Sequence, residues 1–143
     1  VYLGKREKVE NSQSILKEQE QKYNEGDQLS TLEKLKELAH EMKNHLENND
    51  LTRFGEKMDL AFQTKKKLNP SITNQKIEDI SQLAKTNGAI ATRIQGSGGG
   101  GHLLLLCDWN KEHKVSSALL EKGVNCIPFS FVNKGLEVWE GSD

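Results

Sequence analysis

Apolar side chains recur every three or four positions along three stretches of the chain, residues 30–46, 51–68 and 74–85. This spacing places them on one side of an α-helix, so it predicts three amphipathic helices. Asn69-Pro70 stops the second helix and Asn87-Gly88 ends the third, because proline and glycine at these places interrupt a helix. The predicted inward-facing residues are Leu32, Leu35, Leu38, Met42, Leu46, Phe54, Met58, Ala61, Phe62, Leu68, Ile77, Ile80 and Ala84.

The first 26 residues are patterned more weakly. Val1-Tyr2-Leu3 is typical of a short strand closed by Gly4, and sparse apolar positions predict a weak helix at about 11–24. A chain that opens inside a strand lacks the neighbour with which that strand would pair. We therefore expect these 143 residues to be part of a longer protein.

The pattern changes after Gly88. Residues 89–95 are strand-like, and residues 96–101 are glycines with a single serine. Residues 102–107 form a nearly continuous apolar run, short enough for a buried central strand. The sequence thus predicts two strands that flank a glycine-rich connection.

The last third of the chain completes the predicted fold. A helix is predicted from about 110 to 122, followed by strands at 124–132 and 136–139 that the tight-turn sequence 133–135 joins. Helices mixed with short strands and hairpin connections are typical of an α+β domain. We expect a single domain, residues 1–143, in which helices pack on one face of a largely antiparallel sheet of about four strands.

Composition and charge mainly exclude classes of function. A formal net charge of −1 provides no electrostatic case for a nucleic-acid-binding protein. No apolar run approaches the roughly 20 residues of a membrane span, and the start lacks the pattern of a signal peptide. Cys107 and Cys126 lack metal-site spacing, so we predict buried strand thiols. Unpaired thiols suit a reducing compartment, and we expect a cytoplasmic protein.

The glycine tract has three interpretations. A flexible linker is the commonest role of such a run, although here it joins two predicted strands of one domain. A close-packed hairpin needs glycine without any ligand. A phosphate cradle uses consecutive glycines to turn several N–H groups toward one anion. Walker and dinucleotide-binding loops are excluded, because His102-Leu103 follows the tract in place of Lys-Ser/Thr or of a helix.

The flanks of the tract carry a resemblance to a known family. Residues 87–106, from Asn-Gly-Ala through the tract to the apolar run, resemble the third signature motif of the GHMP kinases, which include galactokinase, homoserine kinase and mevalonate kinase. Residues 65–68 and 72–77 are similar to the branch of heptose 7-phosphate kinases, fucokinases and galactokinase-like proteins. The opening residues 2–6 and the closing residues 127–139 match that branch in character, so the resemblance spans nearly the whole chain.

The resemblance implies the C-terminal, ferredoxin-like half of an ATP-dependent kinase that phosphorylates a sugar or a sugar phosphate. In that family the ATP loop and the Asp that acts on the acceptor hydroxyl lie in an N-terminal domain, which would bind most of the ATP and the Mg²⁺. The resemblance therefore implies no catalytic residue and no metal ligand here, and the chain alone is expected to be inactive. It places near the phosphates Gly96, Ser97, Gly98, Gly99, Gly100 and Gly101, and on the substrate side Lys65, Asn74, Arg93 and His102.

Plainer roles stay open for these residues. Lys65 also fits a solvated helix end, where lysine interacts favourably with the helix dipole. A single strand histidine such as His102 is more often packed or partly exposed than bound to substrate. The rival function is a non-catalytic α+β module that binds a ligand or a protein. The acceptor is open as well, among heptose 7-phosphate, fucose, galactose and a mevalonate-like acid.

Overall fold

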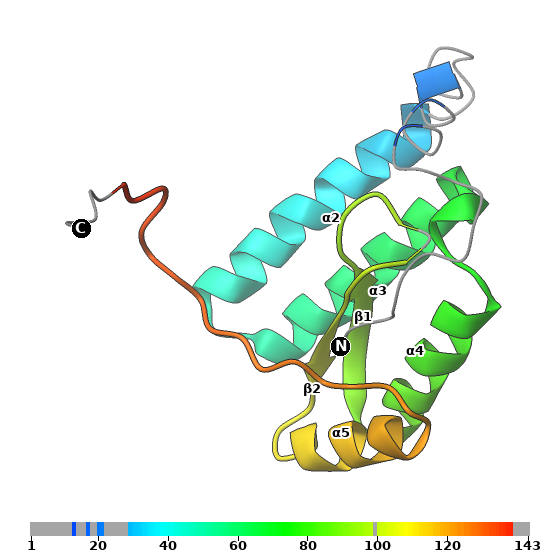
Figure 1. Ribbon diagram of the computed structural model, residues 1–143. Helices are drawn as coiled ribbons and strands as arrows, with labels where there is room; N and C mark the ends of the chain where they lie inside the picture. Colours follow the sequence, from blue (N-terminus) through cyan, green and yellow to red (C-terminus); the bar gives the residue numbers. More distant parts are fainter. Residues whose placement is uncertain (1–12, 14–16, 18–19, 22–28, 99, 139–143) are drawn as a thin grey trace, which may run out of the picture.

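The computed structural model describes residues 13, 17, 20, 21, 29–98 and 100–138 (Figure 1). The predicted amphipathic helices, the two strands around the glycine tract and the last helix are confirmed. The strand predicted at residues 1–4 lies outside the described residues, as does most of the helix predicted at 11–24, of which positions 13, 17, 20 and 21 are helical. In chain order the elements are α2 (Leu29–Glu47), α3 (Leu51–Leu68), the 3₁₀ helix η1 (Pro70–Ile72), α4 (Gln75–Asn87), β1 (Ala89–Ile94), β2 (Leu103–Cys107) and α5 (Glu112–Glu121).

Local capping residues set the ends of the central helices. The carboxylate of Asp50 accepts a hydrogen bond of 3.1 Å from the N–H of Arg53 at the start of α3. Gly88 ends α4 with a φ of 117°, and its N–H donates to the last carbonyls of that helix. Glycine reaches this left-handed conformation without a steric penalty, which explains why Asn87-Gly88 marks the boundary.

The two strands form one antiparallel pair to which the helices are attached. Ile94 lies opposite Leu103 and Ala89 opposite Cys107, with a shift of register between Ala89 and Ala91. α3 and α4 both pack against β1, α2 packs on α3, and α5 packs on α4. In Figure 1, α3 crosses behind the strands, α2 lies beyond α3 at the upper left, α4 lies to the right of the strands and α5 below them. The glycine-rich connection between β1 and β2 is therefore carried at the upper end of the sheet in this view.

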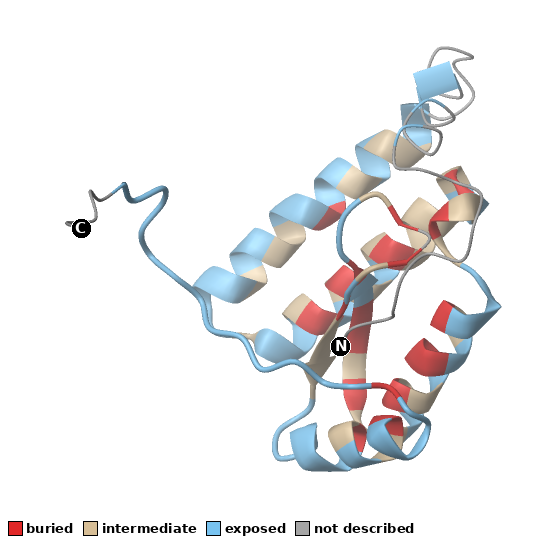
Figure 2. Ribbon diagram, viewed as in Figure 1, coloured by how far each residue is buried: buried red, intermediate tan, exposed pale blue. Residues whose placement is uncertain are grey.

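The core fills the space between the strands and α3, α4 and α5, where Figure 2 shows most of the buried residues. In α2, by contrast, Leu38 is the one buried residue among those described, so this helix covers α3 from outside. Burying aliphatic and aromatic side chains in this way supplies the main favourable term in folding. The core cluster consists of Phe62, Ile72, Ile77, Ile80, Ala84, Ala89, Ile94, Leu103, Val115, Leu119 and Val124.

Asp59 of α3 joins α4 to β1. Its Oδ2 atom lies 2.7 Å from Nζ of Lys85, and its Oδ1 atom accepts a hydrogen bond of 3.4 Å from the N–H of Thr92. Both charged side chains are largely shielded from water, so loss of either partner would leave the other poorly compensated. This contact holds the two helices in register with the first strand.

The two strands predicted at 124–132 and 136–139 are not formed. Residues 124–138 contain neither strand nor helix, and residue 139 lies outside the described residues. Their alternation of apolar and polar side chains favours a strand, but Ile127, Phe129 and Phe131 lie across a cavity from β2 and form no backbone ladder with it. Phe131 and Leu136 are 90% and 94% exposed. The described part of the chain therefore holds a two-stranded sheet, not one of about four strands.

The cysteines differ from each other. Cys107 ends β2 and is partly buried, and burial, with smaller contributions from Glu112 and Cys126, raises the pKa of its thiol. Cys126 is exposed, so the prediction of a buried strand thiol is wrong there, because Cys126 belongs to the segment that forms no strand. No helix among the described residues combines the length and the apolar character needed to cross a membrane.

Glu78 of α4 ties the end of α3 and the turn after η1 to its own helix. Nζ of Lys66 lies 2.9 Å from both carboxylate oxygens, and the hydroxyl of Thr73 donates to Oε1 at 2.6 Å. Burial by itself raises the pKa of Glu78, but the hydrogen bonds from Thr73 and Lys66 together outweigh it and hold the pKa below its ordinary 4.5. The contacts therefore stabilise the ionised carboxylate.

We predict that Glu78→Gln lowers the free energy of unfolding by about 1 kcal/mol at neutral pH, a value reduced for partial exposure. The stabilisation from Glu78 is present above the unfolded pKa and disappears as pH falls through the lower folded pKa, so the variant should approach the parent chain at acidic pH. Urea denaturation at both pH values measures this, with the exposed Glu56→Gln as the matched control. A loss no larger than that of the control would contradict the prediction.

Candidate functional site

The glycine tract is the closed end of the β1–β2 hairpin. The N–H of Gln95 donates to the carbonyl of His102 at 2.8 Å, which closes the base of the loop. Gly96, Gly98 and Gly101 have φ values of 84°, 108° and 90°. These values lie in the region that other residues enter only with strain, so the loop needs glycine at these three positions. Gly99 lies outside the described residues.

The loop is packed against η1. An added Cβ at Gly98 would lie 2.5 Å from Cα and 2.8 Å from the carbonyl oxygen of Ile72, and Ile72 itself is fully buried. Gly98 and Gly100 are both buried. A flexible linker does not make such backbone-to-backbone contact, so the linker interpretation is wrong for the described part of the tract. The hairpin and phosphate-cradle interpretations are both compatible with this geometry.

The turn that supports the loop is built by Asn69, which sequence reasoning treated only as a helix breaker. Asn69 is fully buried, and its side-chain oxygen accepts a hydrogen bond of 3.0 Å from the N–H of Ser71. Pro70 opens η1, where its fixed φ is favourable and its missing N–H costs nothing. The Asn-Pro-Ser sequence is a recognisable turn signal, but its contact with a loop 26 residues later, from Ile72 to Gly98, is not visible in the pattern.

Two of the four substrate-side candidates meet in one cavity. Lys65, near the end of α3, and Arg93, on β1, both line a hollow of about 200 Å³ between α2, α3 and the sheet. Burial lowers the pKa of the Lys65 amine, and the neighbouring Arg93 guanidinium lowers it further. Among the described residues no carboxylate forms an ion pair with either side chain. The remaining lining residues are Leu35, Ala39, Met42, Ala61, Phe62 and Ile94.

Asn74 lies in neither this cavity nor the loop. Its side-chain oxygen accepts a hydrogen bond of 3.0 Å from the N–H of Ile77, so it caps the start of α4. This contact gives Asn74 a structural role that the resemblance did not include. The position of an N-cap before an apolar run could have been recognised from sequence.

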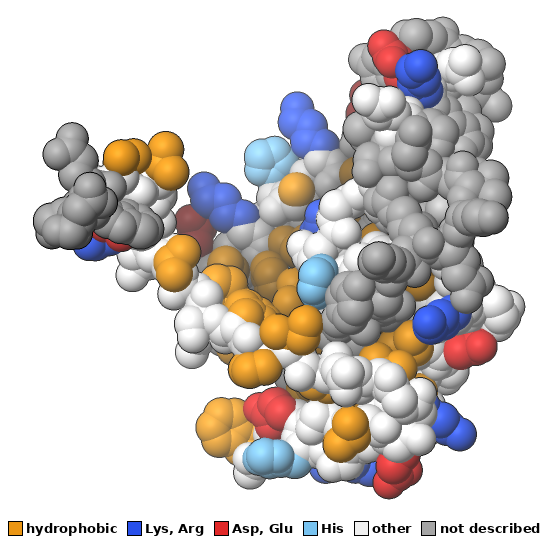
Figure 3. Space-filling model, in the orientation of Figure 1, with side chains coloured by type: hydrophobic (Ala, Val, Ile, Leu, Met, Phe, Trp, Pro, Cys, Tyr) orange, Lys and Arg blue, Asp and Glu red, His pale blue; other side chains and the backbone are white. Residues whose placement is uncertain are grey.

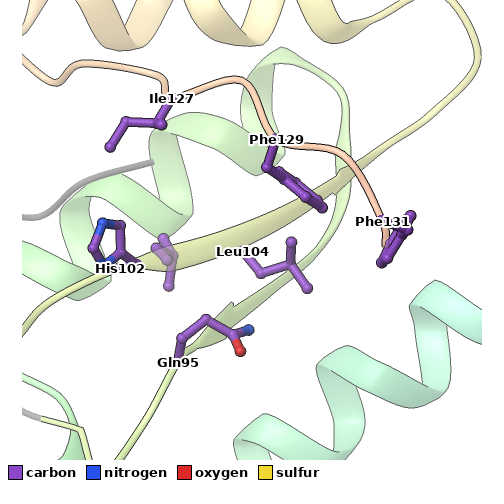
Figure 4. Close-up of a pocket in the computed structure, with 7 residues that line it drawn as sticks. Gln95, His102, Leu104, Ile127, Phe129 and Phe131 are labelled. Atoms are coloured by element: carbon purple, nitrogen blue, oxygen red, sulfur yellow. The ribbon is translucent and has the colours of Figure 1, made fainter. Parts of the chain in front are cut away.

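His102 lines a second, mostly apolar cavity of about 350 Å³ beside β2. Figure 4 shows Phe129 and Leu104 on facing sides of this cavity, with His102 at one end and Phe131 at the other. The rings of Phe129 and Phe131 meet edge to face, with centroids 5.4 Å apart. His102 does not line the cavity that Lys65 and Arg93 share. Sequence reasoning missed the aromatic wall because it assigned residues 124–132 to a strand.

The face that carries β2 and the C-terminal segment (residues 124–138) is rich in apolar side chains. Figure 3 shows them gathered across this side of the molecule. Isolated exposed apolar residues are ordinary, but a continuous patch of this kind is typical of an interaction surface. Within the described part of the chain, no group of three or more His, Cys, Asp or Glu side chains is arranged to hold a metal ion. The exposed large apolar residues of the segment are Ile127, Phe129, Phe131, Val132, Leu136 and Val138.

Comparison with known proteins gives three findings. The family described as GHMP kinases C terminal matches residues 31–125. D-glycero-alpha-D-manno-heptose 7-phosphate kinase of Campylobacter jejuni is 27% identical over 111 residues, which are 78% of this chain and 33% of that protein. The crystal structure of L. major mevalonate kinase in complex with R-mevalonate superimposes with a TM-score of 0.67 and 17% identity, over 80% of this chain and 36% of that one. The chain therefore spans about a third of the length of these relatives.

We predict that Gly98→Ala destabilises the chain by about 2–4 kcal/mol, because it adds a collision with the backbone of Ile72 to the strain of a positive φ. Gly96→Ala is the matched control, since its φ is also positive but a Cβ there meets no described residue within 4 Å. The control should lose only about 1 kcal/mol. Urea denaturation measures both variants, and equal losses would show that the contact with η1 contributes nothing.

Proposed function

The chain belongs to the GHMP kinase C-terminal family, and on that premise we propose that it is the C-terminal domain of an ATP-dependent kinase that phosphorylates a hydroxyl group of a sugar or a sugar phosphate. The kinase class is supported by the family and by the heptose 7-phosphate kinase relative. The fold similarity to mevalonate kinase agrees with the family but carries no information on the acceptor. Family membership also weighs against the rival non-catalytic module.

The observation that carries the proposal is the packed glycine loop. Gly96, Gly98 and Gly101 have positive φ values, and such conformations allow backbone N–H groups of a loop to turn toward one anion. Contact with Ile72 holds the loop in place, so these donors need no ordering when an anion arrives. Among the described residues, nothing lies within 4 Å of a Cβ added at Gly96 or Gly101, which leaves room there for a ligand. We assign residues 96–101 to the phosphate side of the active site.

The remaining parts of the active site are proposed to come from an N-terminal domain of a longer protein. Phosphoryl transfer depends mainly on positioning and on neutralising charge, and ATP with Mg²⁺ supplies the transferred group and part of that neutralisation. The described residues include no cluster of carboxylates that fits Mg²⁺, so we assign no metal ligand to this chain. The apolar face over β2 and the C-terminal segment is the surface we propose for contact with that domain.

The test of the proposed function uses the product of the complete reading frame, with the 143-residue chain as a parallel sample. We expect ADP release that depends on Mg·ATP and on one member of a panel of heptose 7-phosphate, fucose, galactose and mevalonate. We expect none from the 143-residue chain, whose folding is checked by circular dichroism. If the complete protein releases no ADP with any acceptor of the panel, the kinase assignment is overturned. If the 143-residue chain alone turns over, the proposal that an N-terminal domain supplies the rest of the active site is overturned.

A second prediction tests the role of the loop. Gly96→Val in the complete protein should lower kcat/KM for ATP by about tenfold or more, because the new side chain occupies the open space beside the loop N–H groups. Gly123→Val is the matched control, since Gly123 also has a positive φ and open space around it but lies at the end of α5. Equal kinetic losses in the two variants, both assayed below their melting temperatures, would contradict a phosphate-side role for the loop.

A further inference from the structure

Lys65 differs from the other partly buried lysines of the described chain in its charged neighbours. Lys57, Lys66 and Lys85 each meet a carboxylate, at 2.6, 2.9 and 2.7 Å respectively. Lys65 meets none among the described residues, although it lies on the same helix as Lys57 and Lys66. Its charged neighbour across the cavity is a second cation, Arg93. The chain thus neutralises its other shielded lysines and leaves this one opposed to a like charge.

Such an arrangement is unfavourable for the protein alone. A charge that is partly removed from water is disfavoured unless an opposite charge compensates it, and a nearby like charge adds to the cost. The walls around Lys65 include apolar side chains of α2 and α3, which cannot compensate it. The arrangement becomes favourable once an anion lies between the two side chains, because charge-assisted hydrogen bonds then form on both sides. The pair therefore has the electrostatics of a binding site.

The size and place of the cavity limit what it can take. At about 200 Å³ it is smaller than the roughly 300–1,000 Å³ of pockets that enclose a whole small ligand, so it suits one end of a molecule. Arg93 precedes Gly96 by three residues, which corresponds to about 10 Å of extended chain between this cavity and the glycine loop. A monosaccharide that carries a phosphate has dimensions of this order. One end of it could lie in the cavity while another part lies near the loop.

We propose that Lys65 and Arg93 form an anion site for the acceptor, which selects a sugar that already carries a phosphate over the neutral sugar. The inference rests on the kinase function proposed above. Two cations match the charge of about −2 that a phosphate monoester carries at neutral pH, whereas a carboxylate carries −1. The planar guanidinium of Arg93 suits bidentate contact with phosphate, and Lys65 supplies a point charge on the other side.

The test compares two acceptors that differ by one phosphate, heptose 7-phosphate and the same heptose without it, in the complete kinase. Lys65→Gln and Arg93→Gln should each lower kcat/KM for the phosphorylated acceptor by about 10–100-fold, mainly by raising KM. Each variant should change kcat/KM for the neutral sugar by less than about threefold. Lys67→Gln is the control, since Lys67 is an exposed cation two residues from Lys65. It should leave both acceptors unchanged.

A second readout does not depend on turnover. Because no described carboxylate compensates Lys65, Lys65→Met should raise the melting temperature in the absence of ligand. Heptose 7-phosphate should stabilise the parent protein and no longer stabilise the variant. Lys65→Arg should retain stabilisation by the ligand. A lower melting temperature for Lys65→Met without ligand would overturn the claim that the pair is uncompensated.

The outcomes separate this inference from the proposed function. If the parent kinase turns over both acceptors equally well, or if the Gln variants lose both equally, the anion site is overturned while the kinase assignment stands. If inorganic phosphate binds by calorimetry and is lost in the variants, but acceptor preference does not change, the site holds a free anion and the acceptor assignment is overturned. If no acceptor supports ATP turnover, the proposed function itself fails.

Discussion

The contact between Gly98 and Ile72 determines how the rest of the candidate site is arranged. It brings the backbone of the β1–β2 loop against the backbone of the turn after α3, at a separation that leaves no room even for a Cβ. Ile72 belongs to the core, and Asn69 stabilises the turn that presents it. The packing of α3 and α4 on β1 therefore fixes the position of the loop.

Ion pairs between the helices support the same arrangement. The shielded cations of α3 and α4 are paired with Glu41, Glu78 and Asp59, and these pairs tie the helices to one another and to the sheet. The exception is the cavity shared by Lys65 and Arg93, where no described carboxylate is placed. Among the described residues, the other partly buried lysines each meet a carboxylate, whereas Lys65 faces a second cation, an arrangement that the proposed anion site would explain.

Local physics explains what the sequence predicted well. The helical periodicity, the helix end at Asn87-Gly88 and the strands on either side of the glycines depend on near neighbours, and the structure confirms them. Leu46, predicted to face inward, is 54% exposed because it lies in the last turn of the outer helix α2. The family resemblance, which rested on the tract and its flanks, is confirmed by the match over residues 31–125. The strands expected at 124–132 and 136–139 failed for a non-local reason, because alternating apolar residues favour an extended chain but pairing requires a neighbouring strand.

The sequence by itself determined the helices α2 to α5, the strands β1 and β2, and the family, because each of these depends mainly on residues adjacent in the chain. The tertiary structure alone decided which residues meet. Lys65 and Arg93 are 28 positions apart and share a cavity only because α3 packs on β1. The structure likewise showed Asn74 as a cap and His102 beside aromatic residues of the C-terminal segment. Such contacts follow from the burial of side chains shared by distant segments, which no local pattern records.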